Sequence, residues 1–236
     1  MKQYELAIGL RGEGNDPGAF QALFKAIEVD PDNAKAHLLL ANMFLVGRED
    51  NPGNDELVIK HFQEVLRIQA SESAHPEQTL ASDARNGLGV LYLHQKRYDL
   101  AITEFQHAVE DLFNRRAYMA WGNLGRAYYE TAAYDKAEEA LMRAVKQEPR
   151  FCVGYFHLGR TYVKVEQFEK ADHALTQALE ADERCKIFQD AWHLRGETRM
   201  KLGQRDDARA DFERCVELGS RNEAGAACTR YLEATY

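Results

Sequence analysis

The sequence lacks several features that define whole classes of protein. Its 236 residues contain 30 Lys and Arg against 38 Asp and Glu, a formal net charge of −8, so there is no basic excess for binding a phosphate backbone. No apolar run approaches the roughly 20 residues that span a bilayer, and residues 1–5 show no signal-peptide core. Five prolines and 16 glycines are too few for a disordered chain. The composition predicts a folded protein that binds no nucleic acid and is cytoplasmic, or else a mature or trimmed chain.

Motifs that carry catalytic chemistry are also missing. The eight histidines form neither an HxxxH pair nor an HExxH motif, and the few serines lie outside any GxSxG elbow. The glycine-rich segment at residues 12–15 fits a turn between helices better than a phosphate-binding loop. We therefore expect no enzyme activity, no metal site, no cofactor and no small-molecule substrate.

What the sequence does contain is an internal repeat of about 34 residues. Each copy places a small residue, an aromatic residue, an alanine and a large apolar residue in the same order. The clearest copies are Leu88-Gly89, Tyr92, Ala101 and Phe105, then Leu124-Gly125, Tyr128, Ala137 and Leu141, then Leu158-Gly159, Tyr162, Ala171 and Leu175. Spacings of three and four predict helices. Pro31 and Pro149 fall between copies, where a helix must end.

This pattern resembles the tetratricopeptide repeat, a helix–turn–helix unit. The resemblance implies an all-α fold, a right-handed superhelical solenoid forming a single domain. Six repeats are expected at about residues 1–33, 34–81, 82–117, 118–151, 152–188 and 189–221, followed by a capping helix at 222–236. Arg195 and Arg199 stand at apolar positions, so the first helix of the sixth repeat fits the pattern least well.

The first helices of such repeats line a concave wall, and the repeat phase assigns residues to it. In the first two repeats the predicted wall is apolar and contains Tyr4, Ile8, Leu38 and Leu45. Residues 36–46 are apolar on nearly every helical face, more than one packing stripe needs. The surplus indicates either a groove for an apolar peptide or lipid-like group, or tight burial against neighbouring helices.

Further along, the predicted wall mixes aromatic, amide and positively charged side chains. Its members are Asn86, Asn123, Arg126, Tyr129, Phe156 and Arg160. Arginine and tyrosine are frequent anchors of protein interfaces, which favours a binding wall. The alternative is a set of exposed helix residues that contact no partner.

The four cysteines lie in the last third of the chain and form no CxxC motif, which disfavours a zinc site. Cys215 and Cys228 fall on a predicted helix and on the cap that folds back against it. Cys152 and Cys185 lie near the starts of adjacent first helices, so this pair could also come within bridging distance. Two disulfides would favour an oxidising compartment. The alternative is four reduced thiols, with Cys215 filling an alanine-sized core position.

A narrower resemblance is found in the amino-acid sequence of the middle repeats. Its distinctive segments are residues 84–92, 97–102, 120–128 and 149–155, which include Trp121-Gly122-Asn123-Leu124-Gly125-Arg126. With six units and a cap, the chain resembles the pilotin family of type IV pilus biogenesis, in particular its Tgl-like and PilF-like members. The resemblance implies a lipoprotein on the periplasmic face of the outer membrane, whose protein partner is the secretin subunit. The family's lipid is carried by an N-terminal cysteine, and this chain has none before Cys152.

The function expected from this resemblance is binding without catalysis. A pilotin promotes assembly and outer-membrane localisation of the secretin, the channel through which the pilus extends. The apolar wall would hold a secretin segment, and the later wall would supply polar contacts. Two alternatives stay open: a cytoplasmic co-chaperone or scaffold that binds a peptide segment, and a regulatory or peptidoglycan-associated partner of an enzyme.

Overall fold

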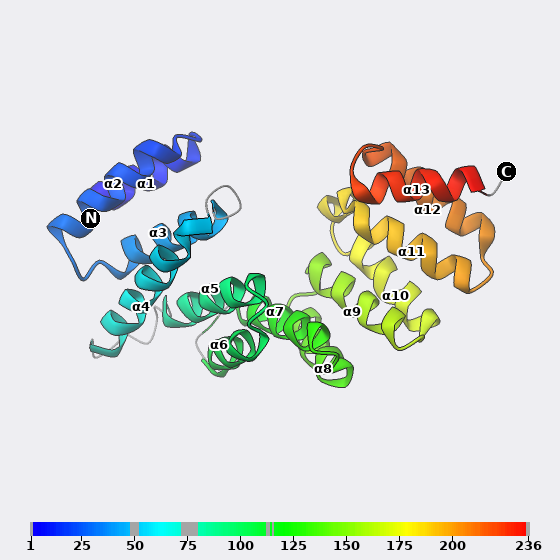
Figure 1. Ribbon diagram of the computed structural model, residues 1–236, viewed down its shortest axis with the longest axis horizontal. Helices are drawn as coiled ribbons and strands as arrows, with labels where there is room; N and C mark the ends of the chain where they lie inside the picture. The colour runs from blue at the N-terminus through cyan, green and yellow to red at the C-terminus, as the bar shows by residue number, and fades with distance from the viewer. Residues whose placement is uncertain (1, 48–51, 72–79, 112–113, 115, 235–236) are drawn as a thin grey trace. The chain divides into compact units, whose positions relative to one another are not determined.

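The computed structural model describes residues 2–47, 52–71, 80–111, 114 and 116–234, and in these residues every regular element is helical. Thirteen α-helices and two short 3₁₀ helices (η1 and η2) follow one another as sequential pairs along the described chain (Figure 1). The contacts divide the chain into an N-terminal unit, Met1–Asn123, and a C-terminal unit, Leu124–Tyr236. No helix in the described ranges has the length and apolar character needed to cross a membrane.

The N-terminal unit holds three helix pairs and the first turns of a fourth. Its elements are α1 (Lys2–Gly12), α2 (Asp16–Val29), α3 (Ala34–Val46), η1 (Pro52–Asn54), α4 (Asp55–Ser71), α5 (Leu80–His94), α6 (Tyr98–Glu110) and the start of α7 (Ala117–Glu130). The expected longer turn near residues 47–54 and the expected polar insert near residues 71–80 fall largely outside the described residues.

The C-terminal unit continues the same alternation and ends in the predicted cap. Beyond the remainder of α7, its elements are α8 (Tyr134–Gln147), α9 (Cys152–Lys164), α10 (Phe168–Glu180), η2 (Glu183–Ile187), α11 (Gln189–Lys201), α12 (Arg205–Leu218) and α13 (Glu223–Ala234). The first helices α9 and α11 start at residues 152 and 189, and α13 follows α12 after a short connection.

The turn inside a helix pair is built the same way in successive repeats. Lys96, Ala132, Glu166 and Gly203 all have a positive φ, between 57° and 76°. The residue after each one donates its backbone N–H to a carbonyl five residues earlier, as Ala133 N does to Tyr128 O at 2.9 Å. This Schellman-type ending satisfies carbonyl groups that the helix leaves unpaired. Backbone hydrogen bonding therefore ends α5, α7, α9 and α11 sharply.

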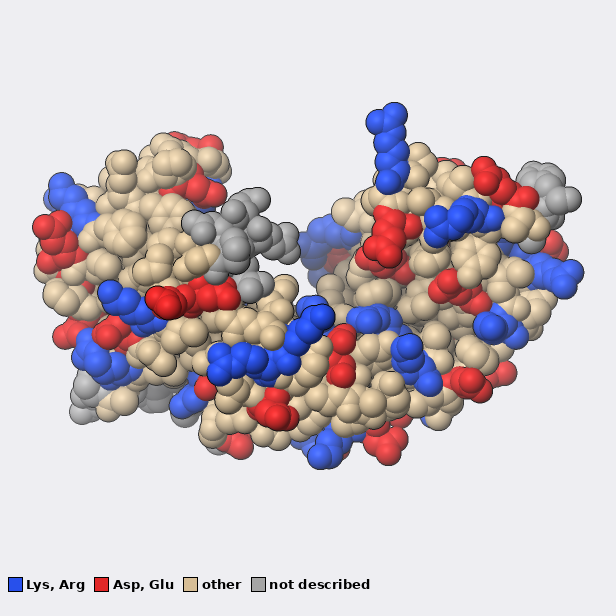
Figure 2. Space-filling model, in the orientation of Figure 1, with Lys and Arg blue, Asp and Glu red and all other residues tan. Residues whose placement is uncertain are grey.

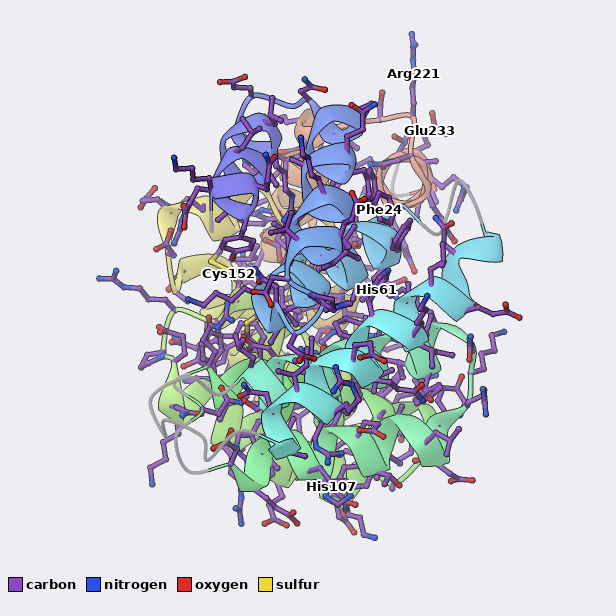
Figure 3. The ribbon with its side chains drawn as sticks, turned by 90° about the vertical axis from the view of Figure 1, so that its left-hand side faces the viewer. Phe24, His61, His107, Cys152, Arg221 and Glu233 are labelled. Atoms are coloured by element: carbon purple, nitrogen blue, oxygen red, sulfur yellow. A yellow bond between two sulfur atoms is a disulfide. The ribbon has the colours of Figure 1, made fainter. Side chains whose placement is uncertain are left out.

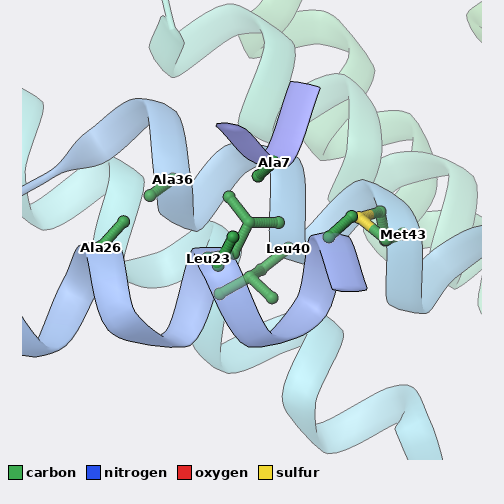
Figure 4. Packing of buried hydrophobic residues seen from close by; sticks show 8 residues of the cluster. Ala7, Leu23, Ala26, Ala36, Leu40 and Met43 are labelled. Atoms are coloured by element: carbon green, nitrogen blue, oxygen red, sulfur yellow. The ribbon is translucent and has the colours of Figure 1, made fainter. Parts of the chain in front are cut away.

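Close helix contact explains the repeated glycine. A Cβ added at Gly125 would lie 2.5 Å from Leu141 Cγ, and one added at Gly159 would lie 2.6 Å from Leu175 Cγ. Gly89 and Gly196 meet Phe105 and Phe212 in the same way. Each first helix thus packs directly on the large apolar residue of its second helix, as the sequence pattern predicted. Figure 4 shows the comparable alanine and leucine packing of α1, α2 and α3, where Leu23 and Leu40 meet beside Ala7.

Candidate partner-binding site

The predicted apolar wall of the N-terminal unit is only partly accessible. Ile8 is 44% exposed on α1, whereas Tyr4 is half-buried against the core formed by α1, α2 and α3. Leu38 and Leu45 are half-buried on α3 and pack against a different core cluster, one that includes Val58 and Phe62 of α4. Much of the apolar surplus of α3 therefore serves packing, one of the two interpretations that the sequence left open.

Other apolar side chains of this unit are more exposed than the predicted ones. Phe24 is 47% exposed and Val46 is 76% exposed. Phe24 belongs to an aromatic group on α2 and α3, because its ring centroid lies 6.5 Å from those of both Phe20 and Phe44. The repeat phase missed Phe24 because it considered only first helices. The signal in the sequence was a phenylalanine one residue beyond the core position Leu23.

A buried histidine pair lies behind this aromatic group. The Nδ1 atoms of His37 and His61 are 2.9 Å apart, so one ring donates a proton that the other accepts. Burial, with the nearby His37 and Lys60, lowers the pKa of His61 to about 4. The ring of Phe44 stacks on His61 at 5.9 Å, and Figure 3 labels His61 and Phe24 in this part of the molecule. The pair is a structural element of the N-terminal unit.

Asn86 and Asn123 are brought together by the fold. Asn123 Nδ2 donates to Asn86 Oδ1 at 3.0 Å, which links α5 to the first turns of α7. The two residues are 37 residues apart, one more than the register of 36 that relates Gly89 to Gly125, so they lie at neighbouring rather than equivalent repeat positions. Part of their hydrogen-bonding capacity is therefore used within the protein, and the remaining amide groups stay half-buried on the first-helix face.

Arg160 is the centre of the predicted residues in the C-terminal unit. Its guanidinium carbon lies 4.5 Å from the ring centroid of Tyr129 and 5.9 Å from that of Phe156, within the range of cation–π attraction. Tyr134 meets Tyr129 edge-on at 5.8 Å, and Phe188 lies 4.6 Å from Phe156. These two aromatic neighbours were not predicted, because both lie outside the first helices.

Positive charge is concentrated beside this aromatic group. Arg160 Nη1 lies 3.4 Å from His157 Nδ1, and its contact with Glu130 is long, at 3.9 Å. Burial, with Arg160 and Arg126, lowers the pKa of His157 to about 3, so the imidazole is neutral. The buried Nε of Arg126 has no hydrogen-bond partner among the described residues. Arg126 and Arg160 thus present guanidinium groups whose donors are incompletely used, which suits a carboxylate or carbonyl group of a partner.

Both cysteine pairs lie in the C-terminal unit and are bonded. Cys152–Cys185 joins the first turn of α9 to η2, and Cys215–Cys228 joins α12 to the cap α13. Figure 3 labels Cys152. The described residues contain no free cysteine and no cluster suited to a metal ion.

On the face that Figure 2 shows, basic and acidic side chains are interspersed among the described residues.

Two models of the tetratricopeptide repeat match residues 67–114 and residues 120–151, 154–185 and 189–233, together more than half of the chain. The chain belongs to the tetratricopeptide-repeat family, whose members are scaffolds that bind proteins and are typically non-catalytic. Within that family it is similar to the type IV pilus assembly proteins PilF and PilW.

The relative matched in sequence is the type IV pilus assembly protein PilF of Pseudomonas aeruginosa, 27% identical over 148 residues. The match covers 60% of this chain and 51% of PilF, so the chain spans about half the length of that curated relative.

Solved structures extend the likeness of the fold. That of Pseudomonas aeruginosa PilF matches with a TM-score of 0.77 and 18% identity, covering 100% of this chain and 96% of the other. PilW, a type IV pilus biogenesis factor, gives 0.77 and 18% with 96% of each chain covered. YrrB, a repeat protein with an unusual peptide-binding site, gives 0.58 and 18%, with 89% and 98% covered. At these identities the structures show a shared fold.

Proposed function

We propose that this protein is a pilotin that binds the secretin subunit of a type IV pilus and promotes its assembly and outer-membrane localisation. The observation that supports this most directly is the likeness to PilF in both sequence and fold. The proposed location is the periplasmic face of the outer membrane, with attachment through a lipid. Two disulfides in one unit are consistent with such an oxidising compartment.

The binding that we propose uses the first-helix faces of both units, each considered by itself. In the N-terminal unit, Ile8 offers accessible apolar surface, while Tyr4, Leu38 and Leu45 shape the layer beneath. In the C-terminal unit, Arg160 and Arg126 offer charged donors framed by Tyr129 and Phe156. Asn86 and Asn123 add amide groups to the N-terminal face.

The test is binding of a purified type IV pilus secretin subunit, measured by surface plasmon resonance. Ile8→Asp and Arg160→Ala are expected to weaken binding about tenfold or more, since buried apolar and arginine anchors dominate interfaces. Leu38 and Leu45 are less suitable positions, because a charge there would also disrupt packing against Val58 and Phe62. Val29→Asp is the matched control, an apolar-to-acidic change at an exposed site on α2.

Circular dichroism and thermal melting would establish that each variant is folded. If Ile8→Asp and Arg160→Ala both bind as tightly as the unmodified protein, the assigned faces are wrong. If the unmodified protein does not bind the secretin subunit at all, the proposed function is wrong.

A further inference from the structure

A second surface lies on the opposite side of α9 from the arginine–aromatic site. It is a groove with a volume of about 850 Å³ between the second helices α8 and α10, and its floor is formed by α9. Tyr155, Leu158 and Tyr162 form that floor, Met142 and Lys146 stand on the α8 wall, and Lys170 stands on the α10 wall. We call it the open groove. The apolar floor and the charged rim distinguish it from an ordinary polar surface.

The equivalent place in the next repeat, between α10 and α12 over α11, contains a buried network of charged side chains. The repeat register, 37 residues, places Arg195 where the open groove has Leu158, and Arg199 where it has Tyr162. Asp211 takes the place of Ala174. Arg195 donates to both carboxylate oxygens of Asp211, at 2.7 and 3.0 Å, and Arg199 Nη1 donates to Asp211 at 3.0 Å. We call this the filled groove.

The two grooves also differ in the charge at their rims. Lys146 of the open groove corresponds to Glu180, 34 residues later, and Lys170 corresponds to Asp207, 37 residues later. Lys146 forms no ion pair with any described residue, and the Lys170 ammonium lies 5.3 Å from the ring centroid of Tyr162. The lining of the open groove also contains Glu139, paired with Arg143, and Glu169, so its rim has only a small excess of positive charge, although the chain as a whole has a net charge of −8.

The dimensions of the open groove suit a short helix. Glu139, Met142, Arg143 and Lys146 line one wall and recur at helical spacing, so the wall is two turns or about 10 Å long. Met142 is 49% exposed, and methionine adapts readily to the shape of a bound side chain. Amphipathic helices bind such grooves by inserting residues one turn apart.

We propose that the open groove is a docking site for an amphipathic helix of another protein, with apolar residues toward Met142 and Tyr155 and carboxylates toward Lys146 and Lys170. This surface is separate from the first-helix faces assigned above, so each can fail without the other. The observation that carries the proposal is the contrast between two equivalent places: one contains a buried ion-pair network, and the other is a groove with an apolar floor, the half-exposed Met142 and a small excess of positive charge at its rim.

The experiment uses a fluorescein-labelled 14-residue helical peptide with leucines on one face and glutamates elsewhere, and a matched peptide with lysines in place of the glutamates. Fluorescence anisotropy is expected to show tighter binding of the glutamate peptide to the full chain. Lys146→Glu with Lys170→Glu is expected to weaken that binding at least about tenfold and to favour the lysine peptide. Both lysines are exposed, so this variant should fold normally.

A second variant, Leu158→Arg with Ala174→Asp, transfers the filling pair of the next repeat into the open groove. It is expected to weaken peptide binding more than about 30-fold, because the apolar floor is replaced and covered. Methyl NMR of the unmodified protein should show the largest peptide-induced shifts at Met142, Val145 and Leu158. Three results would each overturn the proposal. The first is chemical-shift changes confined to other residues, and the second is an unchanged affinity of the glutamate peptide for the Lys146→Glu with Lys170→Glu variant. The third is binding of dodecanoate without binding of the peptide.

Discussion

The open groove and the filled groove occupy the same place in successive repeats of the C-terminal unit, yet their chemistry is opposite. The glycines, alanines and turn residues that set helix spacing are retained in both repeats, as in Gly159 and Gly196. The floor residues are replaced together with their partners: Leu158 faces Ala174, whereas Arg195 pairs with Asp211. A repeat can therefore exchange an apolar surface for an ionic network without changing its helices.

Each groove contains an equivalent hydrogen bond to an acidic residue, and the donor differs between the two. Tyr162 Oη donates to Glu138 at 2.9 Å in the open groove, and Arg199 Nε donates to Asp172 at 2.8 Å in the filled one. Burial and this contact raise the pKa of the Tyr162 hydroxyl, so it remains a donor. The equivalent acidic residues Glu138 and Asp172 thus accept a hydrogen bond from a phenol in one repeat and from a guanidinium in the next.

The largest effect is expected from removing the acid at the centre of the filled groove. Asp211 is 1% exposed, and Asp211→Ala would leave the buried Arg195 and the half-buried Arg199 without their shared partner. Breaking a buried pair in this way should lower the free energy of unfolding by about 3–5 kcal/mol. Urea unfolding followed by circular dichroism measures the loss.

A compensating variant sharpens this test. Arg195→Leu with Arg199→Tyr and Asp211→Ala gives the filled groove the floor of the open one. Most of the lost stability should return, because apolar replacement of a buried ion pair is often neutral or favourable. A triple variant no more stable than Asp211→Ala would show that the two grooves are not interchangeable.

The Cys152–Cys185 disulfide is expected to have the next largest effect. It connects the start of α9, the helix that forms the floor of the open groove, to η2 just before α11. Cys152→Ala with Cys185→Ala should reduce the free energy of unfolding by about 2–4 kcal/mol, since the unfolded chain gains freedom. Urea unfolding without reductant provides the measurement, and an unchanged midpoint would contradict it.

Acid should destabilise the protein through His157, which precedes the open-groove floor residue Leu158, whereas α11 has Leu194 at the equivalent position. The folded pKa of about 3 lies below the unfolded value of about 6.5. The unfolded state therefore binds more protons between these values, and stability falls as pH drops below 6.5. At pH 5 the cost should be about 1–2 kcal/mol.

The variant His157→Asn isolates this contribution, since it keeps a hydrogen-bond acceptor near Arg160 and cannot be protonated in this range. Urea midpoints at pH 7.5 and pH 5 should differ less in the variant than in the unmodified protein. Equal pH dependence in both proteins would assign the acid sensitivity to other groups, such as the buried His61.

The smallest effect is expected at the rim of the open groove. Arg143 Nη2 contacts Glu139 at 2.8 Å, four residues earlier on α8, and both side chains are exposed. Glu139→Gln should change the free energy of unfolding by less than about 0.5 kcal/mol, because solvent screens exposed pairs. Thermal melting in low and in 0.5 M salt would check this value, and a larger loss would indicate that the pair holds the groove wall.

Much of the fold could be predicted from the sequence because the repeat records contacts within each helix pair. The Leu-Gly and alanine positions specify where helices touch, and Pro31 and Pro149 lie in the breaks between α2 and α3 and between α8 and α9. Local spacing is sufficient for these features, since their physical causes act over one or two helical turns.

The candidate sites could be predicted less well because they depend on which side chains meet between repeats. In the sequence, Arg195 departs from the apolar pattern of the sixth repeat. Its partner Asp211 lies on the next helix, so the ion pair is visible only in the structure. The open groove was missed because Met142 and Lys170 lie on second helices, which repeat phase assigns to the outside. The partial burial of Leu38 likewise depends on α4.

The Cys152–Cys185 bond also changes how the chain would carry a mechanical load. The two cysteines are 33 residues apart in sequence and enclose almost all of α9 and all of α10. Tension along the chain would pass through the sulfur–sulfur bond and leave these helices unstretched. The disulfide would thus prevent roughly 110 Å of chain from being pulled out, at about 3.4 Å per residue. Most of the open groove lies within the segment enclosed by the bond. Its floor on α9 and its wall on α10 would therefore stay folded while neighbouring repeats unfolded under load.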